Sequence, residues 1–471
     1  MMETQMTRFD LVVIGAGPGG YPAAFRAADL GMRVALVDPE PHPGGVCLYR
    51  GCIPSKALLH VAAFLHEVEQ APQWGISLGK PEIDLGKLRE WKDSVVARLT
   101  GGLGQLAERR KITFIRGRAR LAGPHHVSVR TVQGETTELV FEHALIATGS
   151  VPASIPGAID SPKVMTSSQA LALDEVPERL LVIGGGYIGL ELGQVYASLG
   201  SRVTVVELMP EVLPGVDRGL VRFLEGRLAG QFESIRVKTK VVRMEEDRNG
   251  VSVSFSGQEV GRDTFSKVLL AVGRRPCAME VGVENTKVSV NARGFIEVDA
   301  QRRTAEPSIF AVGDVAGEPM LAHKATHEGL VAAETMAGRR VAFEPQAIPA
   351  VVFSDPEVAW CGLMEDDARR EGRKVRVTTM PWAASGRATT LARTDGVTRL
   401  VMDPTDGRIL GVGIAGRNAG ELLAEAVLAI EMGAVADDLA LTVHAHPTLS
   451  ETLMEAAQAF AGHSTHFLGN R

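Results

Sequence analysis

The sequence predicts an α/β protein in which one strand–turn–helix–strand unit occurs twice and is followed by an α+β region. Three observations lead to this fold class. A glycine-rich turn follows two separate apolar strand patterns, an acidic residue ends the second strand of each unit, and short β-rich segments begin beyond Pro345. With 471 residues, the chain also exceeds the length at which one hydrophobic core stops growing, so we expect several domains.

The first copy of the unit lies near the start of the chain. An apolar β-rich stretch leads into Gly15, Gly17 and Gly20, followed by an alanine-rich helical stretch and a strand pattern that ends at Asp38. In such a turn the first glycine makes the bend, the second lets the backbone approach a pyrophosphate, and the third lets the helix pack closely on the strand. The acid accepts a hydrogen bond from a ribose hydroxyl.

The second copy repeats this order with Gly184, Gly186 and Gly189 in the turn and Glu207 at the end of the next strand. The interval from the last glycine to the acid is the same in both copies. One such motif is weak, because glycines also serve tight turns and helix ends, but two in the same setting make coincidence improbable. The chain is therefore predicted to contain two Rossmann-like domains that bind two dinucleotides.

Each copy closes on a similar segment, residues 145–149 in the first and residues 269–273 in the second. The first copy is longer between its turn and its closing segment, and the additional residues include a cysteine pair. This asymmetry indicates that the two copies have different roles.

Composition excludes several classes of protein. Apolar residues make up 45% and charged residues 23%, which is close to average usage for a globular protein. The net charge of -6 is mild and no basic face is apparent, so nucleic acid is not an expected partner. No apolar stretch approaches the ~20 residues of a membrane span, and the first ten residues leave no room for a signal peptide. We expect a cytoplasmic protein without a membrane partner.

The chain has four cysteines, Cys47, Cys52, Cys277 and Cys361. In a regular helix the Cα atoms of the first two would be roughly 8.7 Å apart, beyond the ~4.4 to 6.8 Å that a disulfide tolerates. A disulfide between Cys47 and Cys52 therefore requires a break in the helix. Gly51 supplies the backbone flexibility for this break, and Pro54 can begin a new helix. The spacing alone does not exclude the alternative that Cys47 and Cys52 are two unpaired buried thiols. No metal site is expected, because zinc would need two further ligands at matching spacing.

Two histidines near the C-terminus, His444 and His446, precede Glu451. Thiol–disulfide exchange proceeds through a thiolate, and histidine is suited to take the proton near neutral pH. If the segment is extended, the two side chains alternate in direction, so we expect only one to enter a site. Two ordinary, partly buried histidines ahead of a helix remain the alternative.

Residues 44–56 resemble the redox-active disulfide motif of the pyridine nucleotide-disulfide oxidoreductases. The resemblance covers essentially the whole chain, with both glycine motifs, the cysteine pair, the Gly313-Asp314 turn and the string at residues 446–451 in the order of the family. It implies FAD in the first copy, NAD in the second, and a C-terminal α+β dimerisation domain. The expected domains are residues 1–150 (FAD and disulfide), 151–275 (NAD), 276–346 (completing the FAD site) and 347–471 (dimerisation).

The resemblance also implies roles for residues. Cys47 would exchange with substrate, Cys52 would lie beside the flavin, and His446, oriented by Glu451, would be the acid/base that reaches the disulfide of the other subunit of a homodimer. The expected FAD contacts are Gly15, Gly17, Gly20, Asp38, Lys56, Thr148, Gly149, Asp314, Met320, Leu321 and Ala322. The expected NAD contacts are Gly184, Gly186, Gly189, Glu191, Glu207 and Gly273.

By the same resemblance Lys56 would pair with Glu191 next to the flavin, and the helix start after Met320 would face it. From the residues alone, Lys56 could equally be a solvated lysine on a helix, Glu191 a surface acid and Met320 part of the core. Tyr49 and Arg50 depart from the family pattern, which has a small or polar residue and often an aliphatic one between the cysteines.

Within the family, Glu207 favours NAD, because a carboxylate accepts from a free ribose hydroxyl and repels a 2′-phosphate. This weighs against the glutathione reductases, and a tail without cysteine weighs against the mercuric reductases. The branch that oxidises a dihydrolipoyl dithiol is favoured, with the lipoyl group supplied by an acyltransferase or a carrier protein. A reductase of another disulfide or a quinone, or a subunit that mainly docks, remains the alternative.

Overall fold

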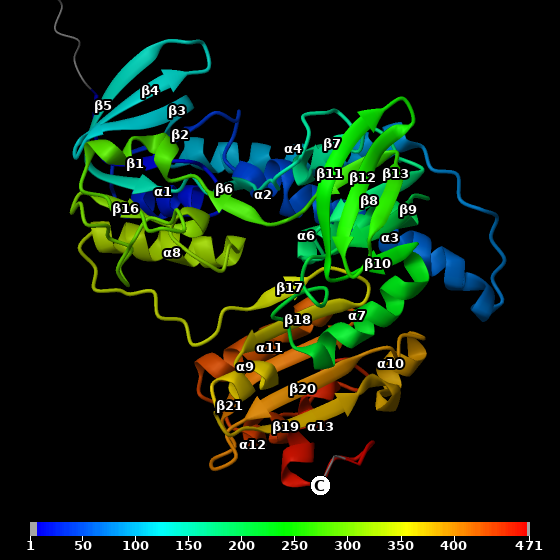
Figure 1. Cartoon of the computed structure of the whole chain (residues 1–471). Helices are drawn as coiled ribbons and strands as arrows, with labels where there is room; N and C mark the ends of the chain where they lie inside the picture. Colours follow the sequence, from blue (N-terminus) through cyan, green and yellow to red (C-terminus); the bar gives the residue numbers. More distant parts are fainter. Residues whose placement is uncertain (1–6, 469–471) are drawn as a thin grey trace, which may run out of the picture.

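The computed structural model describes residues 7–468 and consists of two parallel-sheet bodies and one antiparallel-sheet body (Figure 1). The predicted fold class is confirmed: two Rossmann-like sheets precede a C-terminal sheet of the α+β kind. In Figure 1 the first body lies at the upper left, the second at the upper right, and the C-terminal body below both.

The sheet of the first body has a five-stranded parallel part. Its central strands are buried on both faces, which explains why residues 11–14 and 34–37 read as continuous apolar runs. The order across the sheet is β3 (Thr113–Gly123), β2 (Val34–Asp38), β1 (Thr7–Ile14), β5 (Thr136–Ile146) and β16 (Ile309–Ala311). The outer halves of β3 and β5 pair with β4 (His126–Thr131) in an antiparallel meander.

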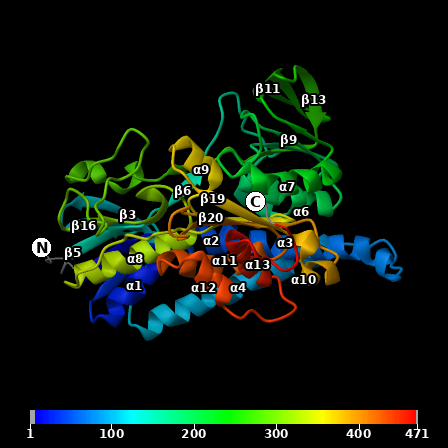
Figure 2. The ribbon, with the colours of Figure 1, turned by 90° about the horizontal axis from the view of Figure 1, so that it is seen from below.

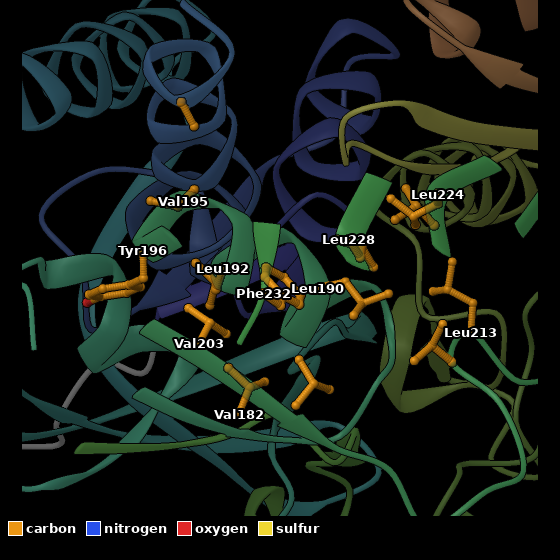
Figure 3. Close-up of a cluster of buried hydrophobic side chains, with 14 of the residues drawn as sticks. Val182, Leu190, Leu192, Val195, Tyr196, Val203, Leu213, Leu224, Leu228 and Phe232 are labelled. Carbon is orange, nitrogen blue, oxygen red and sulfur yellow. The ribbon is translucent and has the colours of Figure 1, made fainter. Parts of the chain in front are cut away.

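The second body repeats this arrangement. Its parallel order is β10 (Ser234–Arg236), β9 (Arg202–Val206), β8 (Arg179–Ile183), β14 (Lys267–Leu270) and β7 (Val164–Thr166). A meander again follows, here as a separate sheet of β11 (Thr239–Asp247), β12 (Gly250–Gly257) and β13 (Gly261–Phe265). Helix α6 (Tyr187–Ser198) packs on the sheet, with Leu190 and Leu192 in the same buried cluster as Val182 and Val203 (Figure 3).

The chain passes between the two bodies twice. It leaves the first body through β6 (Ser150–Pro152), builds the second, and returns through β15 (Arg274–Pro276), which pairs with β6 in an antiparallel ladder. The returning segment then adds β16 and helix α8 (Ala322–Met336) to the first body. Residues far apart in the sequence thus complete one sheet.

Helices cover the sheets and connect the bodies. Helix α1 (Gly20–Asp29) packs beside α8, while α2 (Gly45–Arg50), α3 (Cys52–Gln70) and α4 (Leu85–Arg109) run from the first body towards the second (Figure 2). The remaining helices of the second body are α5 (Ser167–Ala172) and α7 (Arg218–Gln231). None of the helices described is long and apolar enough to cross a membrane.

The C-terminal body is an antiparallel sheet with helices packed against it. The strand order is β17 (Ala350–Val352), β18 (Glu357–Gly362), β21 (Ile409–Gly416), β20 (Val397–Met402) and β19 (Arg376–Pro381). Its helices are α9 (Glu365–Arg370), α10 (Gly386–Thr390), α11 (Ala419–Glu431), α12 (Ala436–Leu441) and α13 (Glu451–Ala461). Val358, Val397 and Ala415 join the core cluster of the second body, so the two bodies share packed apolar surface.

One helix start differs from the sequence-based expectation, and another lies inside a predicted turn. Helix α6 begins at Tyr187, within the second glycine motif, since the last residues of the turn themselves take helical geometry. Helix α3 begins at Cys52 and not at Pro54, because a proline within the first helical turn needs no backbone hydrogen-bond partner.

Candidate active site

The two glycine turns have nearly the same geometry. Gly15 and Gly184 have φ of +99° and +108°, and a Cβ atom on either would lie 2.4 Å from the carbonyl oxygen of the closing Ala147 or Ala271. Only glycine accepts this backbone angle together with such close contact. The closing segments that the sequence singled out therefore pack directly on the turns.

The third glycine of each motif permits the close approach of helix and strand. A Cβ atom on Gly20 would lie 1.9 Å from the Gly15 oxygen, and one on Gly189 would lie 2.1 Å from the Gly184 oxygen. Since real side chains do not tolerate such distances, both helix starts require glycine. Gly186 meets nothing within 4 Å, so its backbone is open to a ligand.

The acid of each copy is held by backbone amides. Asp38 accepts hydrogen bonds from the Ala16 amide at 2.7 Å and the Glu40 amide at 3.0 Å. Glu207 accepts from the Gly185 and Met209 amides, both at 2.7 Å. Burial raises the pKa of Asp38 above its usual range. Each carboxylate is fixed beside its turn, where a ribose hydroxyl can donate to it.

A cavity of about 520 Å³ begins at the first turn and reaches helix α6 of the second body. The first body contributes Gly15, Gly17 and Asp38, and the second contributes Tyr187 and Glu191. Its size falls in the range of pockets that hold small ligands and cofactors. Backbone-lined walls at the turn, with an acid fixed beside it, fit the adenosine half of a dinucleotide such as FAD.

The cysteine pair lines the same cavity, on either side of a helix break. Helix α2 ends at Arg50, α3 begins at Cys52, and a Cβ atom on Gly51 would lie 2.8 Å from the Val46 oxygen. The structure holds Cys47 and Cys52 as thiols. The hydrogen bond between them lowers the pKa of Cys52 to about 7 and raises that of Cys47, and Lys56 favours the Cys52 thiolate further. Cys52 is thus the thiolate of the pair near neutral pH.

Lys56 and Glu191 form an ion pair at the wall of the cavity. The Lys56 Nζ atom lies 2.8 Å from Glu191 Oε2, which also accepts from Ser55 Oγ at 3.2 Å. Glu191 Oε1 accepts from the Phe353 amide at 2.9 Å, and the Phe353 ring centre lies 4.4 Å from Lys56 Nζ. Glu191, expected with the second glycine motif, therefore faces the first cavity. The sequence did not predict the contact with Phe353, which belongs to the C-terminal body.

The Gly313-Asp314 turn reaches the cavity from the returning segment. Asp314 accepts from Ser150 Oγ at 2.5 Å, and the Gly313 amide donates to Glu328 Oε2 at 2.7 Å. Glu328 is fully buried and also pairs with Lys324 and Arg302. Sequence reasoning missed this buried acid, because a lone glutamate on a helix gives no signal.

The other expected FAD contacts divide into two groups. Thr148, Gly149, Met320 and Ala322 line the cavity, and helix α8 begins at Ala322, so its N-terminus faces the cavity. Leu321 is the N-cap residue of α8 and is not among the lining residues that the structure describes. Gly20 also stands behind the wall, where it permits packing.

The second turn lies outside this cavity. Within residues 7–468, Gly184, Gly186, Gly189, Glu207 and Gly273 are not among its lining residues. Tyr187, 41% exposed, begins the helix that joins the second turn to the cavity wall. The two expected dinucleotide sites thus share helix α6 but differ in enclosure.

His446 lies on the C-terminal body, and no residue beyond Ala325 lines the cavity in the described chain. The side chain of His446 is 73% exposed, and its Nδ1 atom lies 2.9 Å from Glu451 Oε1. Burial opposes ionisation of Glu451, but the hydrogen bonds from the Thr448 amide and from His446 prevail and lower the pKa of this carboxyl. His444, by contrast, is packed against Glu425 at 2.8 Å with a side chain only 5% exposed.

Comparisons with known proteins agree with this geometry. Residues 9–329 match the family model described as pyridine nucleotide-disulphide oxidoreductase, and residues 348–457 match its dimerisation domain, which supports a homodimer. A dihydrolipoyl dehydrogenase from Vibrio parahaemolyticus is 46% identical over 97% of this chain and 96% of its own length. One from Thermus scotoductus is 47% identical over 98% of this chain and 100% of its own length.

A solved structure adds the overall shape. The crystal structure of LpdA from Mycobacterium tuberculosis has a TM-score of 0.89 at 26% identity and covers 96% of this chain and 99% of its own. The likeness therefore extends over all three bodies.

Proposed function

Since the chain belongs to the pyridine nucleotide-disulphide oxidoreductase family, we propose that it oxidises a protein-bound dihydrolipoyl dithiol and reduces NAD, as a dihydrolipoyl dehydrogenase. One observation carries the proposal: a thiol pair with one thiolate shares a cavity with a dinucleotide turn and the Lys56–Glu191 ion pair. Full-length relatives that bear this name support it.

FAD and NAD are the cofactors. In our assignment FAD is held by the first turn and Asp38, by Thr148 and Gly149, and by the Asp314 turn with the start of α8. When bound, FAD supplies the two-electron chemistry that links a dithiol to a nicotinamide. Lys56, paired with Glu191, places a positive charge beside the Cys52 thiolate.

The second turn is our site for NAD. Gly186 exposes the backbone that a pyrophosphate approaches, and the Glu207 carboxylate is fixed beside it. Leu208 and Met209, which follow it, are exposed and uncharged, so a 2′-phosphate would meet repulsion without a compensating cation. The site therefore favours NAD over NADP.

The thiol chemistry proceeds by exchange in two steps. With the pair oxidised, one substrate thiolate attacks Cys47 Sγ, forms a mixed disulfide and releases Cys52 as a thiolate. The second substrate thiolate then attacks the substrate sulfur, which closes the lipoyl disulfide and releases Cys47. Two electrons pass from the substrate to the cysteine pair, and a base must take the substrate protons.

We assign that base to His446 of the second subunit. Its exposed ring and its hydrogen bond to Glu451 are suited to accept a proton, since the carboxylate stabilises the imidazolium. In our proposal the homodimer brings this ring to the cysteine pair of the other chain, and monomers are inactive.

The proposed setting follows from the substrate. The dithiol would be carried by a lipoyl-bearing acyltransferase or a lipoyl carrier protein in the cytoplasm. The domains that serve this reaction are proposed as residues 1–150, 151–275, 276–346 and 347–471.

A steady-state assay with free dihydrolipoamide tests the proposal. We expect NADH formation from NAD, little with NADP, and at least a hundredfold lower rate in Cys47→Ser. Full turnover by Cys47→Ser would contradict the assigned order of exchange. Activity with another disulfide or a quinone, but none with dihydrolipoamide, would leave the family assignment intact and show that the proposed substrate is wrong.

A further inference from the structure

The two residues between the cysteines, Tyr49 and Arg50, both reach the loop that follows strand β2. The His42 amide donates to Tyr49 Oη at 3.1 Å, and Tyr49 Oη donates back to the His42 carbonyl at 3.1 Å. The Arg50 guanidinium pairs with the Glu40 carboxylate. Because Glu40 in turn donates its amide to Asp38, these contacts tie the cysteine-bearing helix α2 to the ribose acid.

Arg50 also faces the cofactor cavity. Arg50 and Glu40 both line it, and the Arg50 side chain keeps 41% of its surface exposed despite the ion pair. Its partner Glu40 donates its amide to Asp38, which places the guanidinium at the same end of the cavity as the first glycine turn. Helix α2 begins against that turn, since a Cβ atom on Gly45 would lie 2.5 Å from the Gly17 Cα atom.

The other cations in the cavity have different surroundings. Lys56 is paired with Glu191, and Arg274 donates to Ser150 at 2.7 Å and 2.6 Å through its guanidinium. Arg118 projects from strand β3, two residues beyond the position that pairs with Asp38. Arg50 is the cation carried by the helix that begins at the glycine turn.

We propose that Arg50 is a binding residue for the adenosine diphosphate half of FAD and donates to a phosphate oxygen there. The inference rests on the proposed function only through the identity of the cofactor. A guanidinium is well suited to a diphosphate, because its planar fork of donors matches phosphate oxygens. Tyr49 fixes the backbone that carries Arg50, and the Glu40 carboxylate competes with the phosphate for the guanidinium.

This assignment makes the cysteine segment part of the adenosine site as well as of the redox site. Cofactor retention in this chain should therefore depend on ionic strength through a residue three positions from Cys47.

Rebinding of FAD to full-length apoprotein, followed by flavin fluorescence, tests the proposal. We expect Arg50→Gln to raise the Kd for FAD roughly tenfold or more at low salt, and Arg50→Lys to raise it less. The wild-type Kd should also rise more steeply with salt than that of Arg50→Gln. Arg118→Gln, which removes a cation from another wall of the cavity, is the matched control and should change the Kd less than threefold.

Two further measurements separate phosphate binding from a structural tie. The dissociation constant of ADP should rise in Arg50→Gln by about the same factor as that of FAD, whereas the dissociation constant of adenosine should be unchanged. Glu40→Gln should leave FAD binding equal or tighter, because it frees the guanidinium. Equal weakening in Arg50→Gln and Glu40→Gln, or an unchanged Kd in Arg50→Gln, would overturn the assignment. Failure of the wild type to bind FAD would instead overturn the proposed function.

Discussion

The first and second glycine turns differ far less in themselves than in what surrounds them. In both turns, a Cβ atom placed on the first glycine would lie 2.4 Å from a carbonyl oxygen of the closing segment. In both, the acid accepts a hydrogen bond from a backbone amide of the turn at 2.7 Å. Yet the first turn borders a cavity of about 520 Å³, and the second is not among its lining residues. The comparison teaches that the motif sets how a dinucleotide approaches, while the surrounding elements set whether it stays.

The enclosure of the first turn has identifiable sources. Helices α2 and α3 come from the insertion between turn and closing segment, and β16 with α8 returns after the second body is complete. Helix α8 packs very closely, since a Cβ atom on Gly329 would lie 2.3 Å from the Gly19 oxygen. Such walls suit a retained cofactor, whereas the second turn suits one that exchanges in each turnover.

The largest expected effect separates the two turns directly. Gly20→Ala should prevent flavin binding, because the methyl group would overlap the Gly15 oxygen, and overpacking of this kind costs about 3 kcal/mol. Gly189→Ala should keep the flavin and its reduction by dihydrolipoamide but lose NADH formation. Flavin content per protomer and NADH formation are the measurements.

Gly226→Ala is the control for this pair, since Gly226 lies in helix α7 with nothing within 4 Å. It should fold and bind both cofactors. Loss of flavin in both turn variants alike would break the distinction between the two sites.

The next effect concerns the thiols, which only the first copy contains. The pKa of Cys52 is lowered to about 7, so its thiolate is present above this pH and is protonated below it. In the two-electron-reduced protein, the thiolate-to-flavin charge-transfer band should therefore fade as the pH drops through about 7. Cys47→Ala removes the hydrogen bond that lowers this pKa and should move the midpoint upward by about one pH unit.

Cys277→Ala serves as the control in this titration. Cys277 lines the same cavity, but burial raises its pKa, so it holds no thiolate near neutral pH. Its removal should leave the midpoint of the band in place. An unchanged midpoint in Cys47→Ala would show that the pair does not share the proton.

A smaller effect is expected at the acids. Glu207→Gln leaves one acceptor oxygen for two amide donors, so the KM for NAD should rise roughly tenfold while flavin content stays full. Asp38→Asn, the corresponding change in the first copy, should weaken flavin retention and leave the KM for NAD unchanged. A rise in the KM for NAD in Asp38→Asn would contradict the assignment of the two acids to separate dinucleotide sites.

The smallest effect concerns the packing of α8 on α1. Arg26→Met breaks the partly exposed ion pair with Glu334, and denaturant unfolding should show a loss of at most about 1 kcal/mol. Arg202→Met breaks a more exposed pair with Glu178 in the second body and should cause no measurable change. A large loss in Arg26→Met would mean that α8 is held chiefly by this pair.

The sequence was sufficient to predict the features that are local. Both turns, their acids and the helix break at Gly51 follow from backbone angles and contacts that only glycine accepts, so spacing alone indicates them. The start of α8 after Met320 and the pairing of His446 with Glu451 followed only from the resemblance to the family.

The features that the sequence could not predict depend on contacts between distant segments. Phe353 lies over Lys56 because the C-terminal sheet packs against α6, and no local pattern carries that information. The buried Glu328 holds the Gly313 amide for a similar reason. The tie from Arg50 to Glu40 was visible only as a departure from the family pattern, without a structural meaning.

The most direct test of the account is an anaerobic titration of the purified protein with dihydrolipoamide, followed by NAD. We expect a long-wavelength charge-transfer band between the Cys52 thiolate and the flavin, complete at one equivalent per protomer, and then NADH formation with loss of the band. A flavin that does not respond to dihydrolipoamide but is reduced by NADH would contradict the proposed relay and leave only the fold and the two cofactor sites.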